Sequence, residues 1–308
     1  MNKTPVSLYN YLYKCMKKGF LKGDKLRKPL ELTKKLCSDG IYRYEDPSSN
    51  QYDLDSVVIT ESDELLVLNY HSSPINVSHF QGTSRDRLPE FMSVVDEQSK
   101  LVLPNNLTVV TTYTDADACI LYQQLKRSNI DCVNSFDYAE NFDGEWNMTK
   151  KIDMILGALN HVTTDYVLIC DGYDVFINSF DNIIPKFEST GLRMFFNGTK
   201  NNFPQTHVDR IPYRDWRGEY RYFNAGCAIG YVDDFKYFYE ECSKILPTVS
   251  NPWNSEQLVL RSVFARYSED VDTENKYMDF DWECNIFQTY VNSVVLKLFN
   301  NQPIYAVL

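Results

Sequence analysis

Residues 166–176 read YVLICDGYDVF, and this stretch decides the fold class. Its first part, Tyr166–Cys170, is continuously apolar, which is typical of a strand buried on both faces of a parallel sheet. Asp171 and Asp174 follow, so the strand delivers two carboxylates to the sheet edge where α/β proteins bind ligands. Two such carboxylates can share a hard divalent cation. The alternative is an Asx turn with Asp171 capping the strand exit and Asp174 solvated.

The segments around this stretch alternate between strand and helix patterns. Further strands are expected at 107–112, 132–136, 193–197 and 225–232, and helices at 115–128, 149–161, 234–246 and 255–266. Asp115 and Thr149 are the expected N-caps of the first two helices. This order predicts an α/β fold with a mostly parallel sheet flanked by helices. Before it we expect a helix at 6–20, two short strands in 56–70 and a loop at 72–90.

The composition excludes several classes of protein. The 308 residues are 44% hydrophobic and 24% charged, so the chain is neither disordered nor collagen-like. No apolar run reaches the roughly 18 residues of a membrane span, and no secretory signal is visible. The eight cysteines form no C-x-x-C pair, which favours reduced thiols. We therefore expect an intracellular protein without a membrane span.

Charge is distributed unevenly along the chain. The net charge is −11, but residues 1–43 carry +8 and residues 44–308 carry −19. A helix with a solvated lysine face explains the basic segment, and so does an arm that steers a polyanion toward the body. The sequence leaves both explanations open.

Two weaker motifs follow the acidic turn. Residues 222–232 read YFNAGCAIGYV, where Asn224 and small residues permit close approach of the backbone to a ligand. Residues 254–260 read NSEQLVL and place Glu256 and Gln257 in the first turn of a helix. Glu256 is either a helix-capping acid or a base near an acceptor hydroxyl.

In this order the motifs resemble the glycosyltransferase domain of the procollagen lysyl hydroxylases and its viral relatives. The matching pieces are Asp171-Gly-Tyr-Asp174, FNAGCAIG at 223–230, Ser255-Glu256-Gln257 and Ile286-Phe287-Gln288. The resemblance implies that residues 101–308 form a GT-A-type domain using a UDP-sugar and Mn²⁺ or Mg²⁺. Residues 1–100 are then an N-terminal basic, mixed α+β extension with no assigned function.

The resemblance also implies roles for single residues. Asp171 and Asp174 would be metal ligands that hold the UDP diphosphate. The others would bind uridine (Thr111, Thr112 and Tyr113), approach the nucleotide-sugar (Lys151), contact the sugar acceptor (Phe203, Asn224 and Gln257) or act catalytically (Glu256 and Asn224).

The sequence departs from the family pattern at the third metal ligand. Relatives place a histidine in an H-G-N-G segment after the last strand, whereas this sequence ends at Leu308. Either the sequence is truncated, or water or Asp281 completes the metal shell. The four histidines, at positions 71, 79, 161 and 207, are expected on the surface or in loops.

These observations predict a metal-dependent glycosyltransferase that moves a hexose, glucose or galactose, from a UDP-sugar to a hydroxyl group. The acceptor is a polypeptide with hydroxylysine or a nucleic acid with a hydroxymethylated base. One alternative is a haloacid-dehalogenase-like phosphohydrolase, although Tyr173 occupies the place of that family's second aspartate. The other alternative is a UDP-binding module without catalysis.

Overall fold

A computed structural model describes residues 57–59, 65–67, 75–81, 101–139, 146–200, 220–249, 254–269, 277–290, 294–296 and 305–307. All of them belong to the unit that runs from Asp53 to Leu308. The helix expected at 6–20, the basic segment 1–43 and Phe203 lie outside the described residues.

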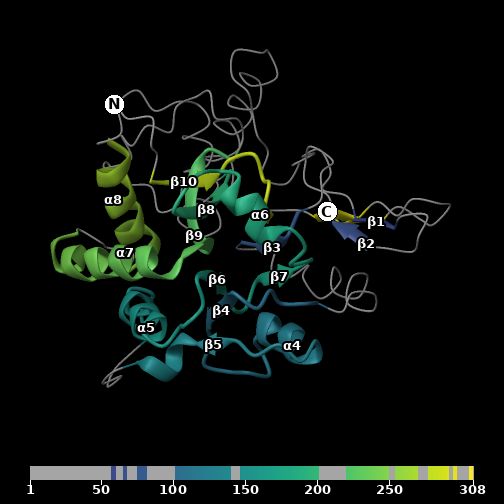
Figure 1. Cartoon of the computed structure of the whole chain (residues 1–308), viewed down its shortest axis with the longest axis horizontal. Coiled ribbons are helices and arrows are strands. Elements are labelled where there is room, and N and C mark those ends of the chain that lie inside the picture. Colours follow the sequence, from purple (N-terminus) through teal and green to yellow (C-terminus); the bar gives the residue numbers. More distant parts are fainter. Residues whose placement is uncertain are drawn as a thin grey trace, which may run out of the picture. The chain divides into compact units, whose positions relative to one another are not determined.

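The described chain contains strands and helices in the alternating order expected of an α/β protein (Figure 1). The strands are β1 Val57–Ile59, β2 Leu65–Val67, β3 Val77–Phe80, β4 Leu107–Thr112, β5 Val133–Asn134, β6 Tyr166–Asp171, β7 Val175–Ile177, β8 Met194–Thr199, β9 Tyr222–Tyr231, β10 Met278–Asp281, β11 Phe287–Tyr290, β12 Val294–Leu296 and β13 Tyr305–Val307. The helices are α4 Ile120–Arg127, α5 Lys150–Leu159, α6 Ile183–Glu188, α7 Val232–Ile245 and α8 Glu256–Glu269.

The main sheet has six strands in the order β10-β8-β9-β6-β4-β5. β4 runs parallel to β5 and β6, and β10 runs parallel to β8, whereas β9 runs antiparallel to both of its neighbours. The carboxyl ends of β4, β6, β8 and β10 therefore meet at one edge, together with the amino end of β9. This mixed sheet flanked by helices is the GT-A-like α/β fold that the sequence predicts.

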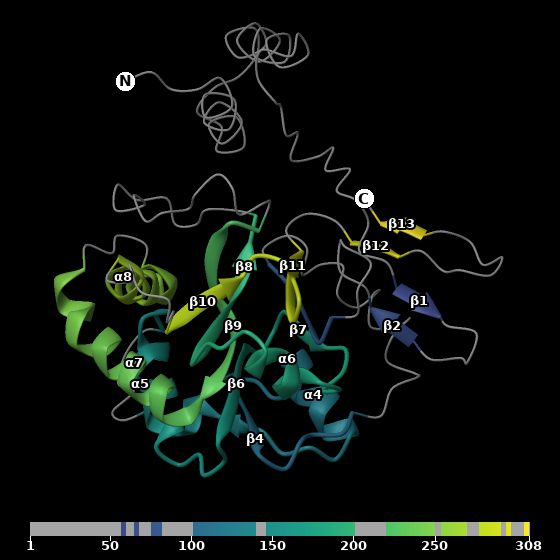
Figure 2. The same ribbon diagram turned by 45° about the horizontal axis from the view of Figure 1, so that its top comes forward.

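A second sheet of three strands, in the order β11-β3-β7, lies beside the main sheet. β3 pairs antiparallel with β7 and parallel with β11. Figure 2 shows β11 next to β8, and the Thr289 hydroxyl on β11 donates a hydrogen bond to the Gly198 carbonyl on β8. The loop expected at 72–90 is therefore wrong at residues 77–80, which form a buried strand.

Alternate residues of β6 face opposite sides of the main sheet, as the period of a strand requires. Val167 and Ile169 belong to a core that includes residues of α5, α7 and α8. Leu168 and Cys170 belong to a second core that includes residues of α4, α6 and the three-stranded sheet. Both faces of β6 are covered, which explains its unbroken apolar sequence.

The expected start of the helix after β4 is corrected by the structure. The helix begins at Ile120, with Cys119 as its N-cap, and not at Asp115. The Asp115 side chain instead accepts hydrogen bonds from the amides of Asp117 and Ala118, which is an Asx turn before the helix. Thr149 is the N-cap of α5 as expected, without a capping hydrogen bond from its side chain.

Two further expectations concern cysteines and membrane spans. All six cysteines among the described residues are free thiols: Cys119, Cys132, Cys170, Cys227, Cys242 and Cys284. In the same part of the chain, no helix combines the length and apolar character needed to cross a bilayer.

Candidate functional site

The carboxyl end of β6 positions the two acidic residues that the sequence singles out. Asp171 is the last residue of the strand, and Asp174 follows after a turn that leads directly into β7. The Gly172 carbonyl at this turn accepts a hydrogen bond from the Leu121 amide at the start of α4. A Cβ atom on Gly172 would lie 2.8 Å from the Cys119 sulfur, so only glycine fits. The turn is therefore held in one conformation.

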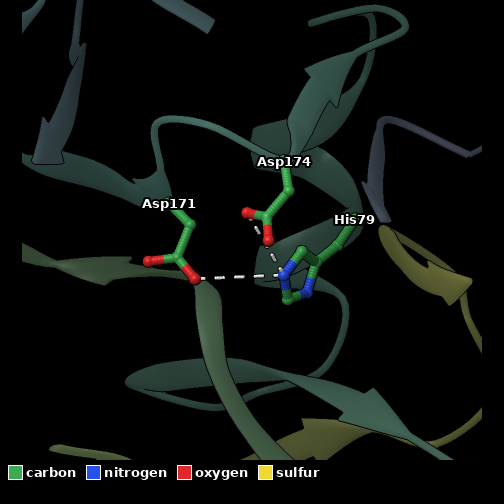
Figure 3. A group of neighbouring side chains, drawn as sticks. All are labelled: His79, Asp171 and Asp174. Carbon is green, nitrogen blue, oxygen red and sulfur yellow. Dashed lines mark ion pairs between the residues drawn. The ribbon is translucent and has the colours of Figure 1, made fainter. Parts of the chain in front are cut away.

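His79 faces both of these carboxylates, although its sequence position is far from theirs. Its Nε2 atom is 3.9 Å from Asp171 Oδ2 and 3.7 Å from Asp174 Oδ1 (Figure 3). The residue is on β3 and only 3% exposed. The expectation that His79 is a surface or loop residue is therefore wrong. Pairing of β3 with β7 places His79 opposite Val175, one residue after Asp174.

The three side chains offer the ligand atoms of a divalent-cation site. One atom from each of His79, Asp171 and Asp174 lies within 4.8 Å of the others. Two carboxylates and one imidazole suit a cation of intermediate hardness such as Mn²⁺. The surroundings also fit this role, because a Cβ atom on Gly226 would lie 2.3 Å from His79 Cε1. The glycine of the FNAG motif leaves the space that the imidazole fills.

Asp171 is also part of a buried chain of charges. Its Oδ1 atom is 2.5 Å from Lys151 Nζ, and Lys151 Nζ is 3.2 Å from Glu256 Oε1. Burial acts to lower the pKa of Lys151, but the negative charges of Asp171 and Glu256 outweigh it and raise that pKa. Burial, with repulsion from Asp171, raises the pKa of Glu256 although Lys151 opposes the shift. Lys151 is therefore a permanent cation shared by two carboxylates.

This charge chain orients Asp171. Lys151 engages Oδ1, whereas Oδ2 is the oxygen that faces His79. The two oxygens of one carboxylate thus serve different partners, and Lys151 on α5 fixes which oxygen points toward the candidate metal centre. Glu256, in the first turn of α8, holds Lys151 from the other side.

Asn224 and Gln257 both bond to the backbone near the start of β9. The Asn224 carboxamide oxygen accepts a hydrogen bond from the Gly226 amide at 2.8 Å. The Gln257 side-chain oxygen accepts one from the Ala225 amide at 3.1 Å. Both residues are buried, so these contacts hold the strand that packs against His79. Their roles toward an acceptor stay predictions.

The end of β4 lies next to Asp171, because Thr112 pairs with Asp171 in the sheet register. The hydroxyls of Thr112 and Ser135 are 2.6 Å apart, and the Tyr113 amide donates to the Asn134 side chain. The buried hydroxyl of Thr111 has no hydrogen-bond partner among the described residues. The Tyr113 ring lies 5.0 Å from that of Tyr122. The uridine contacts expected of Thr111, Thr112 and Tyr113 stay predictions.

Asp281 has a structural role in the described chain. Its Oδ1 atom accepts a hydrogen bond from the Asn285 amide, and Oδ2 accepts from the amides of Ile286 and Phe287. Burial raises the pKa of Asp281 to about 6, although these amides oppose the shift. Both oxygens therefore pin the loop between β10 and β11, and Asp281 is not the group that joins Asp171 and Asp174.

Sequence reasoning missed His79 and the residue behind it, Asn197. The signal that marks His79 is the short stretch Ile75–Phe80, whose strand character depends on pairing with distant strands. Asn197 follows an apolar run on β8, and this run predicts a strand and nothing more. Both are buried polar side chains, at 3% and 0% exposure, and buried polar groups need partners.

Comparison with known proteins adds one match. The family model of the PLOD GT domain matches residues 105–305. No curated protein sequence matches the chain.

Proposed function

Because the chain belongs to the family of the PLOD GT domain, the glycosyltransferase domain of lysyl hydroxylases, we propose that it is a metal-dependent transferase of hexose from a UDP-sugar. The observation that carries the proposal is the group of His79, Asp171 and Asp174 at the carboxyl edge of the main sheet. This edge is where α/β folds bind nucleotides.

The ligand set that we propose differs from the family pattern in its histidine. Relatives take this ligand from a segment after the last strand, whereas His79 lies before the first residue that the family model matches. β3 inserts between β7 and β11 and so brings an imidazole to the same pair of aspartates. His79 is therefore our candidate for the third ligand.

A bound divalent cation would neutralise the charge of the departing UDP diphosphate. Neighbouring residues of the protein hold the three candidate ligands in position. Lys151 holds one oxygen of Asp171 and leaves the other facing His79. Gly172 fixes the turn between the two aspartates, and Gly226 leaves room for the imidazole. These contacts support a centre whose geometry is set before substrate arrives.

Glu256 is our candidate to orient or deprotonate the acceptor hydroxyl. Its pKa is raised by burial, which moves a carboxylate toward the range of a useful general base. Lys151 engages Oε1 of Glu256, and the same lysine engages Asp171. The proposed base and the proposed metal ligand are therefore linked through one cation.

The phosphohydrolase alternative has less support. That mechanism needs an acid two residues after the nucleophilic aspartate, and Tyr173 stands at this position. The Tyr173 hydroxyl accepts hydrogen bonds from the amides of Thr114 and Asp115, so it serves the loop after β4. This position therefore holds a hydroxyl that serves backbone amides and not the carboxylic acid that the mechanism needs.

The test is a donor-release assay with UDP-glucose and UDP-galactose in the presence of Mn²⁺. We expect wild type to release UDP, and Asp171→Ala and His79→Ala to lose most of this activity. Asp233→Ala is the matched control, because Asp233 is a surface carboxylate with 94% side-chain exposure. Equal release by Asp171→Ala and Asp233→Ala would overturn the proposal. Mn²⁺-dependent UDP binding without release by any variant would instead identify a non-catalytic module.

The acceptor is a polypeptide with hydroxylysine or a nucleic acid with a hydroxymethylated base. The +8 charge of residues 1–43 motivates the second option. Each acceptor is offered with the donor that wild type cleaves, and transfer is followed by mass. DNA affinity that falls with salt and is lost on deletion of residues 1–43 supports the nucleic acid. Absence of DNA affinity at low salt excludes it.

A further inference from the structure

Asn197 contacts His79 at Nδ1, the ring nitrogen that points away from the two aspartates. Its carboxamide nitrogen is 3.2 Å from His79 Nδ1 and 2.8 Å from Thr289 Oγ1. The Thr289 hydroxyl donates onward to the Gly198 carbonyl at 2.8 Å. The three side chains come from β8, β3 and β11, and the register of β3 and β11 sets Thr289 opposite His79. A polar relay therefore joins three strands behind the candidate metal centre.

The hydrogen bond at one ring nitrogen decides what the other nitrogen can do. An imidazole that binds a cation through Nε2 is neutral and carries its proton on Nδ1. That proton needs an acceptor, which the carboxamide of Asn197 supplies when its oxygen faces the ring. The oxygen and nitrogen of a carboxamide exchange places by a half turn, and their assignment follows from the hydrogen-bond network.

Two observations indicate that this carboxamide serves His79. Asn197 is fully buried, and its Oδ1 atom has no hydrogen-bond partner among the described residues. A half turn brings this oxygen toward His79 Nδ1, where it accepts the ring proton, and moves the amide nitrogen to the position that the oxygen leaves. The Thr289 hydroxyl accepts from the carboxamide nitrogen, and toward the carboxamide oxygen it would turn its one proton away from the Gly198 carbonyl. Gly226 packs so closely on Cε1 and Nε2 of the ring that the imidazole has little freedom to turn.

We infer that Asn197 is a positioning residue of the metal centre, which accepts the Nδ1 proton of His79 and so presents the Nε2 lone pair to a divalent cation between Asp171 and Asp174. The inference rests on the proposed function, because it assigns a role toward the metal of that site. Thr289 supports Asn197 from the side away from the ring. Asn197 itself contacts neither the metal nor the substrate.

The test measures the affinity of the full-length protein for Mn²⁺ alone, from the electron paramagnetic resonance signal of free Mn²⁺. Asn197→Leu removes the acceptor and should weaken Mn²⁺ binding about 10–100-fold. Asn197→Asp keeps an acceptor of the same shape and should bind Mn²⁺ at least as tightly as wild type. Co²⁺ is the second probe, since its visible absorption spectrum reports loss of the nitrogen ligand.

Asn178 provides the matched control. It is also a buried asparagine with an unpartnered Oδ1 among the described residues, and it donates a hydrogen bond to Ser78, the neighbour of His79. Asn178→Leu and Asn178→Asp therefore repeat the loss of an amide and the gain of a charge close to β3, without the contact to His79 Nδ1. Both should leave the Co²⁺ spectrum unchanged.

The outcomes separate this inference from the proposed function. If His79→Ala binds Mn²⁺ as tightly as wild type does, the proposed metal centre with His79 as a ligand is contradicted. If His79→Ala weakens binding but Asn197→Leu does not, only the inference is wrong. Equal losses from Asn197→Leu and Asn178→Leu also overturn it, as they would reflect general destabilisation. If Asn197→Leu does not fold, the comparison rests on Asn197→Asp. The inference is overturned if Asn197→Asp binds Mn²⁺ more weakly than Asn178→Asp does.

Discussion

The buried cation Lys151 offers a strong test of the charge chain, through the substitution Lys151→Met. Methionine matches the length of the lysine stem but leaves Glu256 buried without its cation. Glu256 and Lys151 have side-chain exposures of 10% and 8%, so water cannot compensate for the loss. Removal of one partner of a buried ion pair costs about 3–5 kcal/mol of unfolding free energy. Asp171 is 26% exposed, so water can solvate its charge once Lys151 is removed.

The loss should depend on pH in a defined direction. Burial already raises the pKa of Glu256, and removal of Lys151 should raise it further. A carboxyl group whose pKa is higher in the folded state than in the unfolded state has no effect on stability at a pH below both values. It destabilises the fold fully at a pH above the folded-state value. The deficit of Lys151→Met relative to wild type should therefore be large near about pH 8 and should shrink toward about pH 4.

Thermal unfolding of both proteins at these two pH values is the assay. The expected deficit corresponds to a fall in Tm of roughly 6–20 °C at the higher pH. Lys244→Met is the control, because Lys244 pairs with Glu241 on the surface, where solvent screens the charges and the substitution should leave Tm almost unchanged. Adding Glu256→Gln to Lys151→Met should recover part of the loss. A deficit no larger than that of Lys244→Met, or one that pH and Glu256→Gln leave unchanged, would show that Glu256 does not depend on Lys151 for its buried charge.

Three further predictions concern single contacts. Gly226→Ala should displace the His79 ring and weaken Mn²⁺ binding at least tenfold, since the new Cβ atom would lie 2.3 Å from the ring; calorimetric titration with unchanged affinity would contradict this. Asp281→Asn should flatten the pH profile of stability. The pKa of Asp281 is raised to about 6, so wild type should lose about 3 kcal/mol as pH rises from about 4 to about 6. Parallel profiles for Asp281→Asn and wild type in chemical denaturation would contradict it. Gln124→Leu should cost about 1–3 kcal/mol, because Gln124 bonds both the amide and the carbonyl of Ile177 on β7; denaturation with no measurable loss would contradict it.

The sequence predicts those parts of the fold whose pattern is local. β4 and the apolar part of β6 lie where their β-branched and apolar runs place them, because a strand covered on both faces needs such a run. The helices near α5, α7 and α8 follow from their periodicity, with differences of a few residues at their ends. The two carboxylates of the site belong to the same local signal.

The sequence does not predict β3, because neither its pattern of residues nor its neighbours in the chain indicate a strand. Its four residues lie between Pro74 and Gly82, which suggest a loop, and the strand forms only by pairing with β7 and β11. His79 is hidden for the same reason. The start of α4 is displaced because the amides of Thr114 and Asp115 bind the Tyr173 hydroxyl, a contact that spans the two loops. Contacts between distant segments thus determine the strand β3 and the start of α4, and the periodicity of the sequence does not report them.

The expected division of the chain near residue 100 stays a prediction. β3 nevertheless lies before this position and pairs with two strands that lie after it. Residues 77–80 are therefore packed with the body of the protein, and the candidate third ligand comes from the segment that the sequence left without a role.

The insertion of β3 between β7 and β11 has a consequence for how the protein matures. During synthesis, β3 emerges long before either neighbour, and its second edge is covered only when residues 287–290 leave the ribosome. Pairings between such distant segments close large loops and are slow to form. The pairing of β3 with β7, which brings His79 to Asp171 and Asp174, needs the chain only as far as residue 177. A chain that has emerged only to β7 therefore contains all three candidate ligands but leaves one edge of the strand that carries His79 uncovered, until β11 closes it.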